Sequence, residues 1–200
     1  MSSYSSLGQR ARTDREGALM AARSVPSPWD RAQALAWVAR YADPEHAIKY
    51  VTEALKAADS CEDPFQQVGS ACWPLRALIE LRRDTEAERV WRGLLLKAGT
   101  VEPMASRAEA WLLLWQAVFP AGSQARDAAW TAILSSCPPD SHWRASRLYR
   151  TVLAQAASID QPAAATMCTT MPAGRTRDKA ITDRKRGLSH GPRDFFWTAG

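Results

Sequence analysis

The sequence predicts an all-α fold, an α-solenoid of about four to five antiparallel helical hairpins with a repeat of ~37 residues. Alanine is common and runs of β-branched residues are scarce, which favours helix over strand. A short motif returns along the chain, and its small residue steps by 37, 39, 37 and 35 residues, through Ala32, Gly69, Ala108, Ala145 and Ala180. A second motif of four apolar residues recurs in phase in the partner helices, beginning with Val51, Ala54, Leu55 and Ala58. Two motifs interleaved at one period are typical of stacked hairpins.

The chain begins with a serine-rich segment, residues 1–9, which we expect to be disordered. A helix is predicted over about residues 10–23, with Asp14 and Glu16 suited to its first turn. Two prolines, at positions 26 and 28, end this helix because proline cannot continue the hydrogen-bond ladder. The helical-repeat domain is therefore predicted over residues 10–187.

Proline and capping residues separate the following helices. Ser27 is a predicted N-cap with Pro28 at the first helical position, and Ser123 is a candidate cap after the break at Gly122. Pro74 falls inside a helix, where it predicts a kink or a restart because it removes a ladder bond. The predicted helices span about residues 28–41, 44–58, 64–82, 85–98, 104–118, 123–136, 142–157 and 175–186, with a weaker one after Gln161 that ends at Pro172.

The last residues, 188–200, leave the pattern and form a predicted C-terminal tail. A terminal hairpin needs a cover, because otherwise its apolar surface stays exposed to water. We expect the aromatic cluster Phe195-Phe196-Trp197 to cap the last hairpin. The alternative is that this cluster docks onto another chain.

The net charge of +5 is unevenly distributed. Residues 1–140 hold 16 Lys and Arg against 17 Asp and Glu, whereas residues 141–200 hold 10 against 4. A basic region can attract nucleic acid, anionic lipid or an acidic protein. The simpler interpretation is a solvated helical face followed by a soluble tail.

The sequence contains no compact catalytic or metal-binding motif. The four cysteines are widely spaced without a zinc pattern, the three histidines are far apart, and phosphate-binding glycine loops are absent. We therefore predict no catalytic residue, no metal ligand, no cofactor and no enzyme activity. No apolar run reaches the ~18 residues of a membrane span, and the N-terminus has no secretory h-region, so a cytoplasmic protein without membrane contact is expected.

One cluster is a candidate binding site. Trp143 begins a predicted helix, and Arg144, Arg147 and Arg150 follow at steps of three residues, which places them on one broad basic face. Arginine next to an aromatic ring can bind phosphate groups and stack on bases, or it can bind an acidic protein. The alternative is an exposed face whose arginines are paired in salt bridges.

The sequence pattern of residues 18–40, ALMAARSVPSPWDRAQALAWVAR, recurs in residues 94–118, LLLKAGTVEPMASRAEAWLLLWQAV. It resembles the bacterial α-solenoid repeats of the tetratricopeptide-like and HEAT-like group. The chain departs from the tetratricopeptide consensus, since its step is nearer 37 than 34 and no W-x-x-L-G-x-x-Y occurs. The resemblance implies a curved scaffold that binds other proteins.

The leading functional hypothesis is a non-catalytic protein-binding scaffold, in one form an adaptor or immunity-type protein that masks its partner. An alternative is a nucleic-acid-binding HEAT-like solenoid that uses the basic C-terminal third. A second alternative is an enzyme whose site lies in the concave groove. The oligomeric state is not predicted by any feature of the sequence.

Overall fold

The structure is a computed structural model that describes residues 3–187 and residue 196 of the 200-residue chain. These residues form eleven α-helices and one short 3₁₀ turn, and no strand occurs among them. The all-α prediction is thereby confirmed. The elements are α1 Ser3–Thr13, α2 Arg15–Arg23, α3 Pro28–Arg40, α4 Pro44–Asp59, α5 Pro64–Glu80, α6 Asp84–Gly99, α7 Met104–Val118, the 3₁₀ turn Phe119–Ala121, α8 Ser123–Ser136, α9 Trp143–Ile159, α10 Gln161–Thr170 and α11 Arg175–Lys185.

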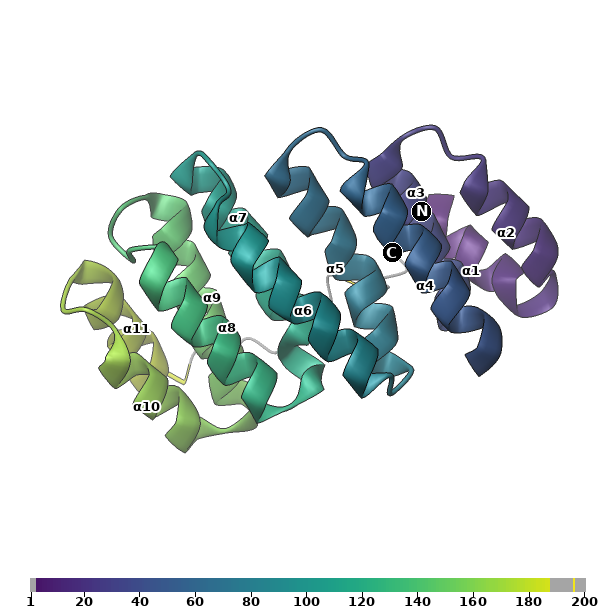
Figure 1. The fold of residues 1–200 in the computed structure, drawn as a ribbon. Coiled ribbons are helices and arrows are strands. Elements are labelled where there is room, and N and C mark those ends of the chain that lie inside the picture. Colours follow the sequence, from purple (N-terminus) through teal and green to yellow (C-terminus); the bar gives the residue numbers. More distant parts are fainter. Residues whose placement is uncertain (1–2, 188–195, 197–200) are drawn as a thin grey trace.

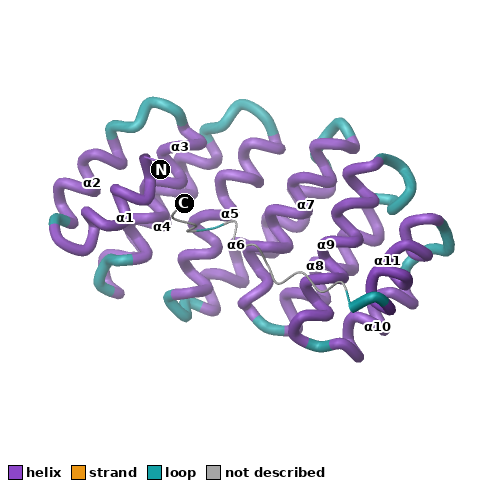
Figure 2. Tube along the Cα trace, turned by 180° about the vertical axis from the view of Figure 1, so that it is seen from behind, coloured by secondary structure: helices purple, strands orange, loops and turns teal. Residues whose placement is uncertain are grey.

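Successive helices lie side by side in one row, from α1 and α2 at one end to α10 and α11 at the other (Figure 1). Each of the odd-numbered helices α3, α5, α7 and α9 contacts the next odd-numbered helix along this row, and the last of these contacts is with α11. Each of α4, α6 and α10 packs against the odd-numbered helix before it in the chain. Figure 2 shows the same row from behind, with helices and short loops only. None of the helices in the described ranges is long and apolar enough to cross a membrane.

The small residues of the recurring motif are all buried, as close packing of helices requires. Gly69 shows the reason most clearly, because an added Cβ would collide with the Trp29 ring of the neighbouring helix α3. Four tryptophans, whose large side chains fill space between the helices, are also buried: Trp91, Trp111, Trp115 and Trp130.

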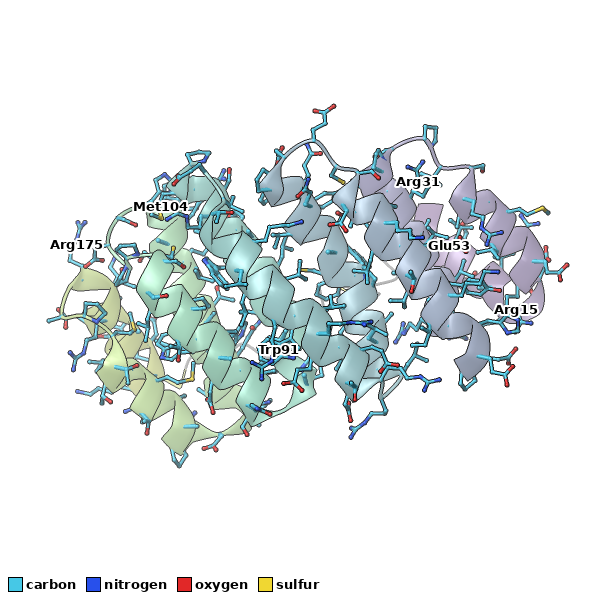
Figure 3. All side chains as sticks on the ribbon, in the orientation of Figure 1. Arg15, Arg31, Glu53, Trp91, Met104 and Arg175 are labelled. Atoms are coloured by element: carbon cyan, nitrogen blue, oxygen red, sulfur yellow. The ribbon has the colours of Figure 1, made fainter. Side chains whose placement is uncertain are left out.

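The loops between hairpins share a feature that the sequence did not reveal. In each loop one apolar residue points inward, and a side chain of the next helix donates a hydrogen bond to its carbonyl oxygen. Arg31 donates to Val25 at 3.0 Å, and Arg107 donates to Val101 at 2.8 Å. The other donor and acceptor pairs are Gln67 to Cys61, Tyr149 to Cys137 and Arg177 to Met171. Arg31, Met104 and Arg175, labelled in Figure 3, lie at this loop edge of the row.

The N-terminus differs from the sequence-based expectation. Disorder was predicted for residues 1–9, but α1 begins at Ser3, so the prediction is wrong for residues 3–9. The reason is tertiary, because Gly8 lies so close to the Trp37 ring of α3 that an added Cβ would collide with it. The predicted helix 10–23 is also divided, since Asp14 caps α2 by accepting a hydrogen bond from the Gly17 amide at 2.9 Å.

One further local prediction needs correction, and at Pro74, where a kink or a restart was predicted, the restart does not occur. Gly122, with φ of 104°, is the N-cap of α8, and Ser123 is the first residue inside that helix rather than its cap. Helix α5 runs through Pro74 and does not restart there. Helices α3, α4, α6 and α7 pack against α5. This packing holds α5 together at Pro74, where one backbone hydrogen bond of the helix is missing.

Candidate functional site

The four residues predicted as a binding site share the first half of α9. Trp143 is the most exposed of the tryptophans that the structure describes, with 61% of its surface accessible. The guanidinium carbons of Arg144 and Arg147 lie 5.3 Å and 5.7 Å from the centre of its ring. His142 starts this helix by accepting a hydrogen bond from the Arg144 amide at 3.2 Å. Trp143 is therefore an exposed aromatic ring flanked by two cations.

The three arginines are not free, because carboxylates on the neighbouring helices pair with them. Arg147 binds Glu109 of α7 at 2.5 Å, and Arg144 approaches the same carboxylate at 3.6 Å. Arg150 binds Asp183 of α11 at 2.7 Å. The arginines of this face are therefore paired in salt bridges, as in the alternative interpretation of the sequence. Sequence reasoning missed both acidic partners, although Glu109 precedes Arg147 by 38 residues, about one repeat step.

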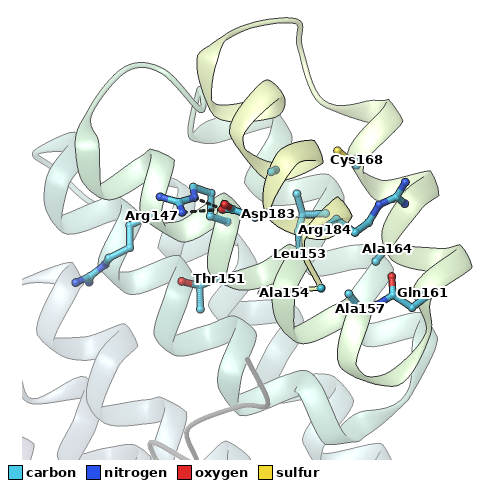
Figure 4. Close-up of a pocket in the computed structure, with 13 residues that line it drawn as sticks. Arg147, Thr151, Leu153, Ala154, Ala157, Gln161, Ala164, Cys168, Asp183 and Arg184 are labelled. Carbon is cyan, nitrogen blue, oxygen red and sulfur yellow. Dashed lines mark hydrogen bonds and ion pairs between the residues drawn. The ribbon is translucent and has the colours of Figure 1, made fainter. Parts of the chain in front are cut away.

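A pocket of about 240 Å³ opens beside these arginines, between α9, α10 and α11 (Figure 4). Its polar residues include Arg147, Arg150, Asp183 and Arg184. In Figure 4, Arg147 and Arg184 lie on opposite sides of Leu153. The apolar wall is made of Leu153, Ala154, Ala157, Ala164 and Ala180. Arginines around an apolar wall suit a ligand that joins a carboxylate or phosphate to a small apolar group.

The thiol groups offer no activated nucleophile. All four cysteines are free and buried, and Cys168 lies in the wall of the pocket. Burial raises the pKa of the Cys168 thiol, and the nearby charges of Arg184 and Arg177 offset this rise only in part. Burial also raises the pKa of Cys137 to about 11 and that of Cys72 further still. Such thiols stay protonated at neutral pH and react slowly.

Among the residues that the structure describes, no group of three or more His, Cys, Asp or Glu side chains is positioned to hold a metal ion. Asp183, in the wall of the pocket, and Glu80, which joins α5 to α3, are each bound to an arginine. These pairs join neighbouring helices and match a structural role for both residues.

A second site lies on α5 and involves the end of the chain. Phe196 is fully buried, with its ring edge-on to Trp73 at 5.0 Å and the guanidinium carbon of Arg76 at 5.6 Å from the ring centre. The expectation that the tail caps the last hairpin is thus wrong for Phe196, which packs on α5 rather than on α10 or α11. Phe195 and Trp197 lie outside the described residues.

The residues that receive Phe196 are held by their neighbours. Arg76 donates to Glu80 at 2.8 Å and to the carbonyl oxygen of Gln116 in α7 at 3.2 Å. Glu80 also binds Arg40 of α3 at 2.7 Å. With its amide oriented to satisfy both tryptophans, Gln33 of α3 accepts hydrogen bonds from the indole nitrogens of Trp73 at 3.1 Å and Trp29 at 2.6 Å. Three helices therefore fix this site.

Comparisons of the chain with models of known protein families, with curated proteins and with solved structures give no match.

Proposed function

We propose that the helices form an α-solenoid, with each hairpin related to the next by a near-constant step along the chain. Side-chain contacts between successive odd-numbered helices support this arrangement, because the partners in Arg40–Glu80, Arg76–Gln116 and Trp115–Gln155 are each 40 residues apart. The even-numbered helices show a similar step, 38 residues in Asp59–Lys97 and 40 in Trp130–Thr170. Equivalent helices that touch at a constant sequence separation are typical of repeat arrays.

The function that this arrangement supports best is the non-catalytic binding of a protein partner along the odd-numbered helices. The observation that carries the proposal is the unbroken contact from α3 through α5, α7 and α9 to α11. It places the exposed Trp143, its flanking arginines and the pocket along one extended row of helices. Tryptophan and arginine are the residues most enriched in the energetic centres of protein interfaces. An adaptor or immunity-type protein that masks its partner is one form of this function.

Site-specific photo-crosslinking tests this proposal. The photoreactive amino acid benzoylphenylalanine replaces Trp143 in one variant and Leu96, an exposed apolar residue of α6, in the matched control. In the cells from which the protein comes, we expect Trp143→benzoylphenylalanine to give a discrete crosslinked protein and Leu96→benzoylphenylalanine to give none. Equal crosslinking from both positions, or none from either, would contradict the proposal.

The ion pairs favour a protein partner over nucleic acid. A phosphate backbone would have to compete with Glu109 and Asp183 for Arg147 and Arg150, two of the three arginines of the basic face. Fluorescence anisotropy with duplex and single-stranded probes at two salt concentrations separates these alternatives. The phosphate contribution is largest at low salt, so binding that is strong there and falls steeply with added salt would restore the nucleic-acid alternative.

A further inference from the structure

Phe196 occupies a site that is built from parts of the chain far from it in sequence. Its ring is fully buried against Trp73 and beside the Arg76 cation, although these residues precede it by more than 100 positions. The edge-on contact with Trp73 and the nearby guanidinium are both favourable geometries for an aromatic ring. Phe196 therefore makes defined contacts with an aromatic ring and with a cation.

The site is organised independently of Phe196 itself. Gln33 orients the Trp73 indole, while Glu80 and the Gln116 carbonyl hold Arg76 in place. These supports come from α3, α5 and α7, and α5 packs against both of the other two helices. A site whose side chains are fixed before the ligand arrives loses less conformational entropy on binding.

We propose that the Trp73–Arg76 site is a binding site for the aromatic side chain of an extended peptide, and that Phe196 of the same chain occupies it in the free protein. This proposal rests on the proposed function. It adds the chemistry of the partner, which is a peptide segment with an exposed phenylalanine. Such a partner competes with Phe196. Because Phe196 is covalently attached, its local concentration is on the order of millimolar, so the tail acts as a built-in competitor.

The structure makes this contact within one molecule. Phe196 lies nine residues after Gly187, the last described residue before it. The test must distinguish this contact within one chain from the same contact made between two copies of the chain.

The experiment uses full-length protein and a fluorescent peptide with the sequence of residues 188–200. The receptor is the Phe196→Ala variant, in which the site is vacant, and wild-type protein is the comparison. We expect the peptide to bind the variant at least tenfold more tightly than the wild type, because the wild-type site is occupied. A peptide that carries Phe196→Ala itself should lose this binding, and an unrelated glycine–serine peptide with one phenylalanine should compete.

Two receptor variants in the Phe196→Ala background locate the site. Trp73→Leu should abolish peptide binding, whereas Ile159→Ala, an exposed residue at the end of α9, should leave it unchanged. If Trp73→Leu is unfolded by circular dichroism, Arg76→Gln replaces it, with at least a threefold loss expected. Equal binding to wild-type and Phe196→Ala protein, no binding to folded Phe196→Ala protein, or equal binding of the Ala peptide overturns the proposal.

Light scattering completes the test. A monomeric wild-type protein is expected, and a dimer that dissociates on Phe196→Ala substitution would overturn the contact within one chain. The peptide assay requires no natural partner, so its failure is distinct from a failure of the crosslinking at Trp143. If the peptide binds but no partner crosslinks, the site exists and the protein-binding function proposed for the row of helices is wrong.

Discussion

Two buried tryptophans of α7, one helical turn apart, differ in a single hydrogen bond. The Trp115 indole donates to the Gln155 side chain of α9 at 2.8 Å, and both groups are buried. The Trp111 indole nitrogen is also buried but has no acceptor in the described part of the chain. The unpaired donor of Trp111 already costs stability in the native protein. Removing the donor of Trp115 would instead leave its buried acceptor, Gln155, without a hydrogen bond. The two positions should therefore respond differently to the same substitution.

We expect Trp115→Phe to lower the free energy of unfolding by about 1–3 kcal/mol more than Trp111→Phe does. Both substitutions remove the same ring volume, so the difference isolates the hydrogen bond. Urea unfolding of the two variants, followed by circular dichroism, measures it. Gln155→Leu serves as a control, because in its presence the excess cost of Trp115→Phe should shrink. Equal losses at the two positions would contradict this account.

A second residue-scale contact joins α11 to the loop before α9. The Thr176 hydroxyl donates to the Asp140 carboxylate at 2.5 Å, and the Thr176 amide donates to it at 3.1 Å. The hydroxyl bond is the largest cause that holds the pKa of Asp140 below its ordinary value. A lowered folded-state pKa stabilises the fold above the unfolded value of about 3.9, and this contribution is lost as the pH falls through the folded-state value.

Thr176→Val should therefore destabilise α11 at neutral pH, with a difference from wild type that shrinks below about pH 4 as Asp140 becomes protonated. Hydrogen exchange of the α11 amides at several pH values measures this difference. Thr176→Ser keeps the hydroxyl and should behave like wild type. A difference that persists unchanged at pH 2 would mean that Thr176 acts through packing alone.

Helix boundaries were the most predictable elements, because their determinants are local. Pro28, Pro44 and Pro64 each begin a helix, and the side chains of Ser27 and Asp63 accept hydrogen bonds from amides in the first turn. Helix α1 was missed for the opposite reason. Its serine-rich sequence has no apolar stripe. The close approach of Gly8 to the Trp37 ring of α3 is a tertiary contact that the local sequence does not indicate. Local signals therefore predicted where helices begin, but not what holds a weak helix in place.

Two glycines inside helices test whether close helix approach is the purpose of the recurring small residue. Gly69 of α5 faces the Trp29 ring, whereas Gly93 of α6 has no atom within 4 Å of an added Cβ. We expect Gly69→Ala to destabilise the protein by about 1–3 kcal/mol through overpacking. Gly93→Ala should stabilise it by about 0.5–1 kcal/mol, since alanine favours helix. Thermal or urea unfolding measures both, and a stabilising Gly69→Ala would show that the contact is loose.

At the scale of the whole molecule, the candidate site was only partly predictable. Trp143 and its three arginines are local on α9, where Arg144 and Arg147 flank the Trp143 ring. Their partners, Glu109 and Asp183, stand on other helices, so no local pattern pairs them with α9. Phe196 and Trp73, which are also in contact, are even farther apart in the sequence. If the proposed repeat holds, its step indicates pairs such as Glu109 and Arg147, which are 38 residues apart, whereas Phe196 lies beyond the last proposed repeat.

The four buried cysteines are spread along the row and report on how the whole molecule unfolds. Cys72 lies in α5, which contacts four other helices, while Cys168 lies in α10, next to α11 at the end of the row. In α11 only Thr176 and Ala180 are buried. In an array where each hairpin contacts only its neighbours, the terminal unit opens most often.

We therefore expect Cys168 to react first with a thiol reagent in native buffer and Cys72 to react last, with rates at least tenfold apart. Burial suppresses each thiol in the closed state, so labelling reports opening of the surrounding hairpin. Peptide mass spectrometry after timed labelling gives the four rates. Thr176→Val should accelerate Cys168 and leave Cys61 and Cys72 unchanged, because it loosens α11 and the loop after Cys137. One common rate for all four thiols would mean that the helices open as a single unit, and the independent-hairpin description would then be wrong.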